Sequence, residues 1–319
     1  MTLRLTMTLI GAGLLAVVPF VLPSMQLLVS LALAKGIGVL GVTILLRAGQ
    51  VSFGHALFFG ISAYAGAFLI GSVPGADLIV ILIAGTLAAT LSGLLVGLFM
   101  VRYRGIFFGM LNLAFSMIFW SILEKFYHIT GGADGIRFAR PSVLGMELGR
   151  HDFELVLFYG SIGLMLVLGW FVLHWLTSPV GQLFQTIKTN ETRLEYLGVS
   201  PKRAMLNGYV LSAALCGIGG ALVGATQGLV TPEYVWWVRS AEMVFIAVLG
   251  GAGSVPGAFI GTLIYETIRI YASAYAGDVW QMILGAFLLV IILFAPGGIT
   301  GIFAKLFSRK AEPEKEGGE

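Results

Sequence analysis

Charge and cysteine are scarce in this chain of 319 residues. Only 11% of the residues are charged, whereas an ordinary soluble domain is about a quarter charged. Hydrophobic residues make up 58% of the chain and the mean hydropathy is +0.94, which argues against a soluble globular protein. The single cysteine, Cys216, lies in an apolar block, so no disulfide framework can form within the chain. The composition therefore predicts a polytopic membrane protein.

Motifs for catalysis and for cofactor binding are also missing. No lysine follows a glycine, so the chain lacks the Gly-x-x-x-x-Gly-Lys-Ser/Thr loop that cradles phosphates, and we expect it not to hydrolyse ATP by itself. The four histidines do not pair at metal-ligand spacing, and the basic residues are dispersed without a patch that would track nucleic acid. We therefore expect no enzyme activity, bound cofactor, bound metal or nucleic-acid partner.

Apolar blocks fill most of the chain and alternate with short connections. At roughly 20 residues per helical span, they predict about eight to eleven membrane passes in one all-α transmembrane bundle over residues 1–303. One block differs, because Gly and Pro residues break it near 248–262, and membranes tolerate such a break where the freed backbone faces protein or water. The predicted spans are 1–22, 25–46, 51–73, 78–101, 105–123, 153–177, 204–228, the broken 241–271, and 280–303.

Lysine and arginine residues near the span ends set the predicted orientation. If both termini are cytoplasmic, residues 178–203 form a cytoplasmic loop and residues 124–152 form an extracytoplasmic loop. A cytoplasmic C-terminus requires two half-length or tilted passes through the broken block 241–271. The charged tail, residues 304–319, has a composition that favours disorder.

The polar segment 178–203 reads SPVGQLFQTIKTNETRLEYLGVSPKR. Its apolar residues recur at helical spacing and predict the apolar side of two short amphipathic helices. Asn190 can cap the second of these helices, Glu191 lies favourably in its first turn, and Gly198 supplies a stop. The recurring apolar residues are Leu183, Ile187, Leu194 and Leu197.

Several further stretches occur in a family-like order. GQVSFGHALFFGISAYAGAFL (Gly49–Leu69) is followed by RYRGIFFGMLNLAFS (Arg102–Ser116) and TGGADG (Thr130–Gly135). The polar segment 178–203 and VLGGAGSVPGAFIGT (Val248–Thr262) come next. Together these stretches resemble the permeases of the branched-chain amino acid ABC importers, specifically the LivM-type subunit, and the resemblance covers nearly the whole chain.

The resemblance implies a bacterial plasma-membrane permease subunit that moves branched-chain amino acids inward. It also implies partners: a paralogous LivH-type permease, two cytoplasmic ATPases that use ATP and Mg²⁺, and an extracytoplasmic solute-binding protein. The residues expected to couple the chain to the ATPases are Lys188, Thr189, Asn190, Glu191, Arg193, Glu195, Leu197 and Gly198. The candidates for the pathway or gate are Gln50, Ser52, His55, Gly250, Gly251, Gly253, Pro256 and Gly257.

Two alternatives stay open. The chain has Val42 before the Gly-Gln pair, at a place where a polar Asn is typical of the family. Urea, short amides and small carboxylates therefore stay alternative solutes. A stand-alone secondary transporter also uses broken helices and intramembrane charges, although acidic residues are sparse within these spans.

A few ionisable residues lie within the predicted spans and need partners there. An unpaired charge at the membrane centre costs about 2.5 to 3.5 kcal/mol on the insertion scale. Glu266 and Arg269 are three residues apart and can form an ion pair on one helix face, whereas Lys35 has no evident local partner. His55 also needs a polar partner, and the candidates nearby in sequence are Gln50, Ser52 and Ser62.

Overall fold

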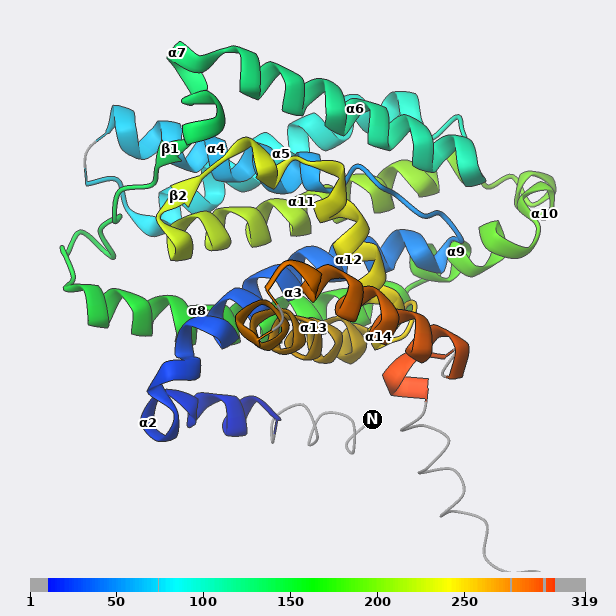
Figure 1. The fold of residues 1–319 in the computed structure, drawn as a ribbon. Coiled ribbons are helices and arrows are strands. Elements are labelled where there is room, and N and C mark those ends of the chain that lie inside the picture. The colour runs from blue at the N-terminus through cyan, green and yellow to red at the C-terminus, as the bar shows by residue number, and fades with distance from the viewer. Residues whose placement is uncertain (1–10, 74, 276, 295–296, 302–319) are drawn as a thin grey trace, which may run out of the picture.

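The computed structural model describes residues 11–73, 75–275, 277–294 and 297–301, and the predicted tail 304–319 lies outside these ranges. Most of the described chain is helical, and the rest consists of loops, one pair of two-residue strands and isolated bridges (Figure 1). The longer helices are α3 (Gln26–Arg47), α4 (Ala56–Ser72), α5 (Leu78–Met100), α6 (Gly105–Lys125), α8 (Arg150–Thr177), α11 (Pro201–Gln227), α12 (Trp237–Gly250), α13 (Val255–Tyr275) and α14 (Trp280–Phe294).

Short helices, 3-10 turns and the two strands connect these long helices. Strand β1 (Ile136–Arg137) pairs antiparallel with β2 (Leu229–Val230), with Ile136 opposite Val230. The short α-helices are α2 (Val18–Val21), α7 (Tyr127–Thr130), α9 (Pro179–Thr189) and α10 (Glu191–Tyr196). The 3-10 turns are η1 (Pro23–Met25), η2 (Gly132–Asp134), η3 (Pro232–Tyr234) and η4 (Gly277–Val279).

The all-α membrane bundle is confirmed. Within the described residues, five helices are long and apolar enough to cross a membrane, and the bent pair Pro232–Gly250 and Val255–Tyr275 adds up to one more. Three shorter apolar helices, Gly11–Val21, Ala56–Ser72 and Trp280–Ile291, lie beside them. The total of eight to eleven passes stays a prediction, because these shorter helices are below spanning length.

Helices α3 and α11 form the centre of the bundle. In their most apolar windows 83% and 78% of the residues are buried, against 22% for α5, 28% for α6 and 33% for α8. Figure 1 shows α4, α5 and α6 on one side of this central pair and α8, α13 and α14 on the other. A helix that is hydrophobic all round fits the centre, whereas α5, α6 and α8 keep an apolar face for lipid.

Glycines let α11 lie against α4 and α5. A Cβ atom on Gly220 would clash with the carbonyl oxygen of Phe59 in α4, and one on Gly217 would lie 2.6 Å from Cβ of Ala89 in α5. Small residues at such contacts allow close van der Waals packing, which drives helix association in lipid. Helix α11 is therefore held against α4 and α5 by backbone proximity as well as by side chains.

The two long polar segments lie at opposite ends of the bundle (Figure 1). Residues 126–149 fold across one end, where β1 pairs with β2 and Ser142 bonds to Ala76. Helices α9 and α10 lie at the other end. We call these the β1–β2 end and the α9–α10 end.

The predicted Gly/Pro break is confirmed. Helix α12 ends at Gly250 and α13 begins at Val255, and the two helices are bent by 116°. Gly251 and Gly253 have φ values of +117° and +84°, which a residue with a Cβ rarely adopts. The hydroxyl of Thr300 donates to the Gly250 carbonyl at 2.7 Å and so satisfies one of the backbone groups freed at the break.

Candidate functional site

The polar segment 178–203 folds as the two predicted short helices, α9 and α10. The Ser178 hydroxyl accepts from the Gly181 amide at 3.3 Å, and the Asn190 side chain accepts from the Arg193 amide at 3.2 Å. Each contact satisfies a helix-start donor that would otherwise be unpaired. Gly198 has a φ of +75° and ends the segment as predicted.

The apolar side of this segment is only partly as predicted. Phe184, Ile187 and Leu194 are buried against the bundle, but Leu197 is 72% exposed and the neighbouring Tyr196 is 87% exposed. Helix α10 ends at Tyr196, so the helical period no longer carries Leu197 to the buried side. Two large apolar side chains therefore project from the α9–α10 end.

The other predicted coupling residues surround this projection. Lys188, Thr189, Asn190, Arg193, Glu195 and Gly198 are all exposed. Glu191 is different, since its carboxylate forms a two-bond contact with the Arg104 guanidinium: Nη2 to Oε1 at 2.6 Å and Nε to Oε2 at 3.0 Å. Paired, parallel bonds of this kind are strong and directional. Glu191 thus ties α10 to the start of α6.

The Gly49–Gln50 pair also contacts the start of α6. Gly105 is the first residue of α6, and its amide donates to the side-chain oxygen of Gln50 at 2.8 Å. A Cβ on Gly49 would lie 3.0 Å from the Lys188 side chain of α9. Three predicted motifs, far apart in the sequence, therefore converge on one junction at the α9–α10 end, which we call the α6 junction: Gln50, Arg104, Gly105 and Glu191.

Buried neutral polar residues form a second group. The His55 ring nitrogen Nδ1 lies 2.6 Å from the Ser52 hydroxyl, as predicted, whereas Gln50 faces the α6 junction and Ser62 forms no side-chain hydrogen bond among the described residues. The ring packs edge-on against Tyr209, whose hydroxyl donates to the Asn112 side chain. We call this the neutral group: Ser52, His55, Asn112, Ser116 and Tyr209, all at most 1% exposed.

The candidate gate residues at the break are unevenly placed. Gly250, Gly251 and Gly257 are buried, Gly253 is half-buried and Pro256 is exposed. A Cβ on Gly253 would lie 3.8 Å from the Arg47 side chain, so the break reaches the α9–α10 end. The structure does not bring these residues together with Ser52 or His55.

Sequence reasoning missed the partner of Lys35. Its ammonium lies 2.5 Å from Glu266 Oε1, and Arg269 Nη1 lies 3.5 Å from the other oxygen of the same carboxylate, which confirms the predicted Glu266–Arg269 pair. Arg239 pairs with Glu242 at 3.2 Å nearby. We call this the charged group: Lys35, Arg239, Glu242, Glu266 and Arg269. Its members come from three helices, and no local sequence signal links Lys35 to the residues of the other two helices.

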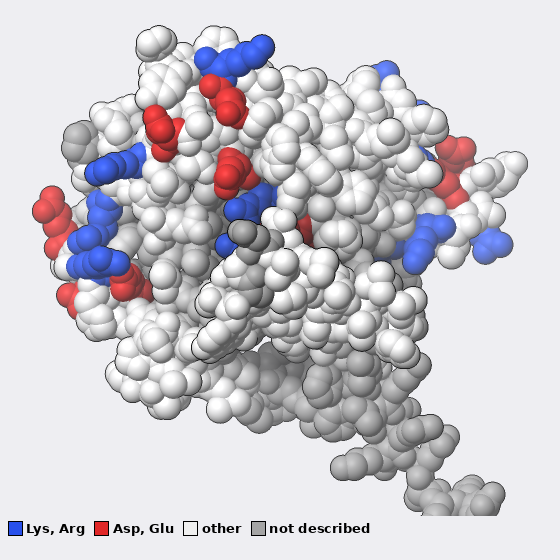
Figure 2. All heavy atoms as spheres, viewed as in Figure 1, with Lys and Arg blue, Asp and Glu red and all other residues white. Residues whose placement is uncertain are grey.

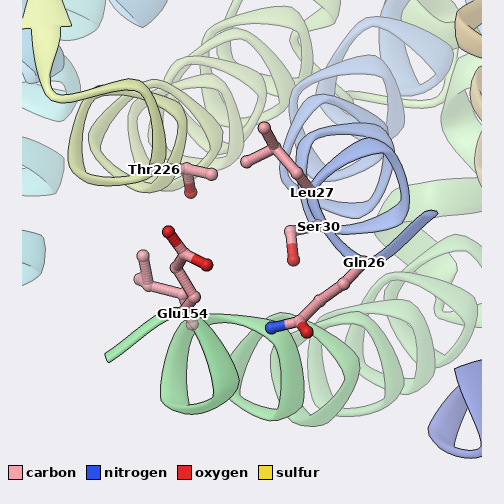
Figure 3. A pocket seen from close by; sticks show the side chains of 6 residues that line it. Gln26, Leu27, Ser30, Glu154 and Thr226 are labelled. Atoms are coloured by element: carbon pink, nitrogen blue, oxygen red, sulfur yellow. The ribbon is translucent and has the colours of Figure 1, made fainter. Parts of the chain in front are cut away.

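Charge elsewhere gathers at the ends of the bundle. Figure 2 shows blue and red atoms at both ends, and one mixed group on the broad face between them. A small hollow of about 220 Å³ lies near the β1–β2 end, where Glu154, Gln26, Ser30 and Thr226 surround a shared space (Figure 3). The exposed Arg150 pairs with Glu154 at 2.8 Å, so this hollow lies at the margin of the bundle.

These features define a class: a multi-pass helical membrane protein with amphipathic helices at one end and a broken helix pair. A family model described as the permease component of branched-chain amino acid transport systems matches residues 24–293, and the chain belongs to this family.

Curated relatives cover most of the chain. The LivM permease protein of Escherichia coli K12 is 28% identical over 79% of this chain and 64% of its own length. The LivM permease protein of Salmonella typhimurium LT2 is 28% identical over 84% of this chain and 68% of its own length. The LivH permease protein of the latter is 34% identical over 33% of this chain and 34% of its own. No solved structure matches significantly.

Proposed function

We propose that this chain is a permease subunit of a bacterial ABC importer that moves leucine, isoleucine and valine inward across the plasma membrane. Family membership and the LivM relatives support this function. The partners would be a LivH-type permease, two cytoplasmic ATPases that bind and hydrolyse ATP, and an extracytoplasmic solute-binding protein. In this assembly both termini and the α9–α10 end face the cytoplasm.

The α6 junction is the observation that carries the mechanism. Tyr196 and Leu197 are exposed, with Glu195 and Arg193 beside them, and we expect these two side chains to dock in a groove on an ATPase. The Arg104–Glu191 contact then passes a displacement of α10 to the start of α6.

The Gly49–Gln50 loop extends the same route. Gln50 bonds to Gly105, and the chain runs on from Gln50 to Ser52 and His55 at the start of α4. Movement of the ATPases would thus reach two helices of the bundle. The break at 250–257 lies at the same end and would allow α12 and α13 to change their angle, which makes it a gate candidate.

Variants of the reconstituted complex can distinguish two roles of this end: binding of the ATPases, and transmission of their movement to the bundle. Leu197→Asp is expected to release the ATPases, because it places a charge in an apolar contact, while Met146→Asp is the matched control at the β1–β2 end. Glu191→Gln is expected to keep the ATPases bound and to uncouple ATP hydrolysis from leucine uptake. Co-purification and uptake in liposomes are the two readouts. Normal uptake by both variants would remove the coupling role.

The same assay decides between the classes of transporter. Uptake that requires ATP and the partner subunits is the expected result. Ion-driven uptake by this chain alone would instead identify a secondary transporter. Competition by urea, short amides or small carboxylates, added in excess over leucine, tests the alternative solutes.

A further inference from the structure

A cleft opens beside the charged group on one side of α3. The space between its side chains is about 490 Å³ when it is counted out to the open mouth. Helices α3, α4, α11, α12 and α13 all contribute lining residues. No residue of the α6 junction or of the break lines this cleft. It is the larger of the two hollows described.

Charged residues form one wall of the cleft. Lys35, Arg239, Arg269 and Glu242 line it, and Glu266 lies behind them with its side chain 4% exposed. Three cations thus face two carboxylates, the buried Glu266 and Glu242, which keeps 15% of its side chain exposed, so one positive charge is in excess. Glu233 reaches Arg239 only at 3.8 Å and is 77% exposed, so water weakens its contribution.

One donor in this wall is unused. Arg269 Nη1 is buried and forms no hydrogen bond among the described residues, although Glu266 lies 3.5 Å away. Unsatisfied buried donors are rare and call for an explanation. A carboxylate is the group that an arginine binds best, because its two oxygens match the guanidinium fork. The wall is therefore suited to the carboxylate of a ligand.

The charged wall also excludes lipid. A charge facing the acyl chains costs about 2.5 to 3.5 kcal/mol on the insertion scale, and this wall carries several. Ionisable residues within membranes face water or protein and mark solute pathways. The cleft therefore belongs to a hydrated route or to a covered interface.

Apolar residues form another part of the lining, which we call the apolar wall. Val39, Phe59, Val223, Met243 and Ile246 line it. The two walls together match a ligand with a carboxylate, an ammonium and an aliphatic side chain: the cations take the carboxylate, Glu242 takes the ammonium, and the apolar wall takes the side chain. Urea and short amides would leave the charges unmatched.

We propose that this cleft is a binding site for the zwitterionic aliphatic amino acid during its passage, with Arg269 holding the carboxylate and Glu242 the ammonium. The proposal rests on the proposed function and assigns its solute to named residues. It predicts that the solute contacts this chain directly after its release from the binding protein.

The test uses a diazirine analogue of leucine with the complete complex in lipid nanodiscs. After irradiation, mass spectrometry should find the label on peptides of α3, α4, α11 or α12 that carry the apolar wall, and unlabelled leucine should compete with it. Arg269→Gln and Glu242→Gln should each weaken this competition by about tenfold or more, because each removes a charged hydrogen-bond partner.

Matched variants guard against misfolding. Arg150→Gln removes the same kind of charge from an exposed pair and should label like the wild type. Met243→Trp fills the cleft without changing its charge and should abolish labelling, whereas Met110→Trp, on an exposed position of α6, should not. Arg269→Lys should recover part of the competition.

Two results would overturn the proposal: label outside the cleft walls, or cleft label that leucine does not displace in a complex that transports leucine. Failure of the wild-type complex to transport leucine at all would instead count against the proposed function. The two failures are therefore distinguishable.

Discussion

The neutral group and the charged group bury polar atoms in the same bundle in different ways. In the neutral group, Tyr209 bonds to Asn112, Ser116 bonds to the Val235 carbonyl at 2.6 Å, and packing seals every member from solvent. In the charged group, Arg239 and Arg269 keep 33% and 27% of their side chains exposed and line a cleft. Sealed polar atoms hold helices together, whereas charges beside a cleft are available to a ligand.

Close glycine contacts are what seal the neutral group, and their loss should have the largest effect. We expect Gly54→Leu to cost more than about 3 kcal/mol of stability, because a Cβ at this position would already clash with the backbone oxygen of Asn112. Thermal unfolding in detergent, followed by tryptophan fluorescence, measures the change. Gly163→Leu is the control, since a Cβ there meets nothing within 4 Å. Equal stability of the two variants would contradict the sealed packing.

Removing the shared carboxylate should come next. Glu266→Gln leaves Lys35 and Arg269 without their counter-charge, and breaking a buried pair in this way costs about 3 to 5 kcal/mol. The same unfolding assay applies. Glu154→Gln, which removes an exposed carboxylate, serves for comparison. A small loss for Glu266→Gln would mean that water already screens the charged group.

A neutral pair should be worth less. Asn112→Leu leaves the buried Tyr209 hydroxyl without its partner and should cost about 1 to 3 kcal/mol. Adding Tyr209→Phe removes the stranded hydroxyl, so the double variant should be more stable than Asn112→Leu. A double variant that is less stable would show that the hydroxyl has another partner.

The smallest effect should come from charge at the ends. Arg150 is 81% exposed and pairs with Glu154 one helical turn away. We expect Arg150→Ala to leave the melting temperature unchanged, since exposed pairs contribute little. A clear drop in the melting temperature would show that ion pairs outside the charged group also stabilise the bundle.

Local pattern was enough to predict the helices. The apolar blocks 78–101 and 105–123 nearly coincide with α5 and α6, and Asn190 caps α10 as its position suggests. The break near Gly250 was also predictable, because glycine and proline change the backbone conformation at their own positions. The motif 50–55 is not helical, so α4 begins later than the predicted span.

Contacts between distant helices were not predictable in the same way. Lys35 and Glu266 are 231 residues apart, and Arg104 and Glu191 are 87 residues apart. Helical period shows which side of a helix is apolar, but it does not show which helix lies opposite. The charged group, the α6 junction and the cleft all depend on such pairings.

The Lys35–Glu266 pair has a consequence for how the chain enters the membrane during synthesis. Helix α3 is made early, yet α11 and α13, which cover it, follow much later. Helix α3 carries no acidic residue, so Lys35 has no counter-charge until Glu266 of α13 has been synthesised. Lys35 therefore enters the membrane unpaired, at a cost of about 2.5 to 3.5 kcal/mol on the insertion scale, and gains its counter-charge only when one of the last helices arrives.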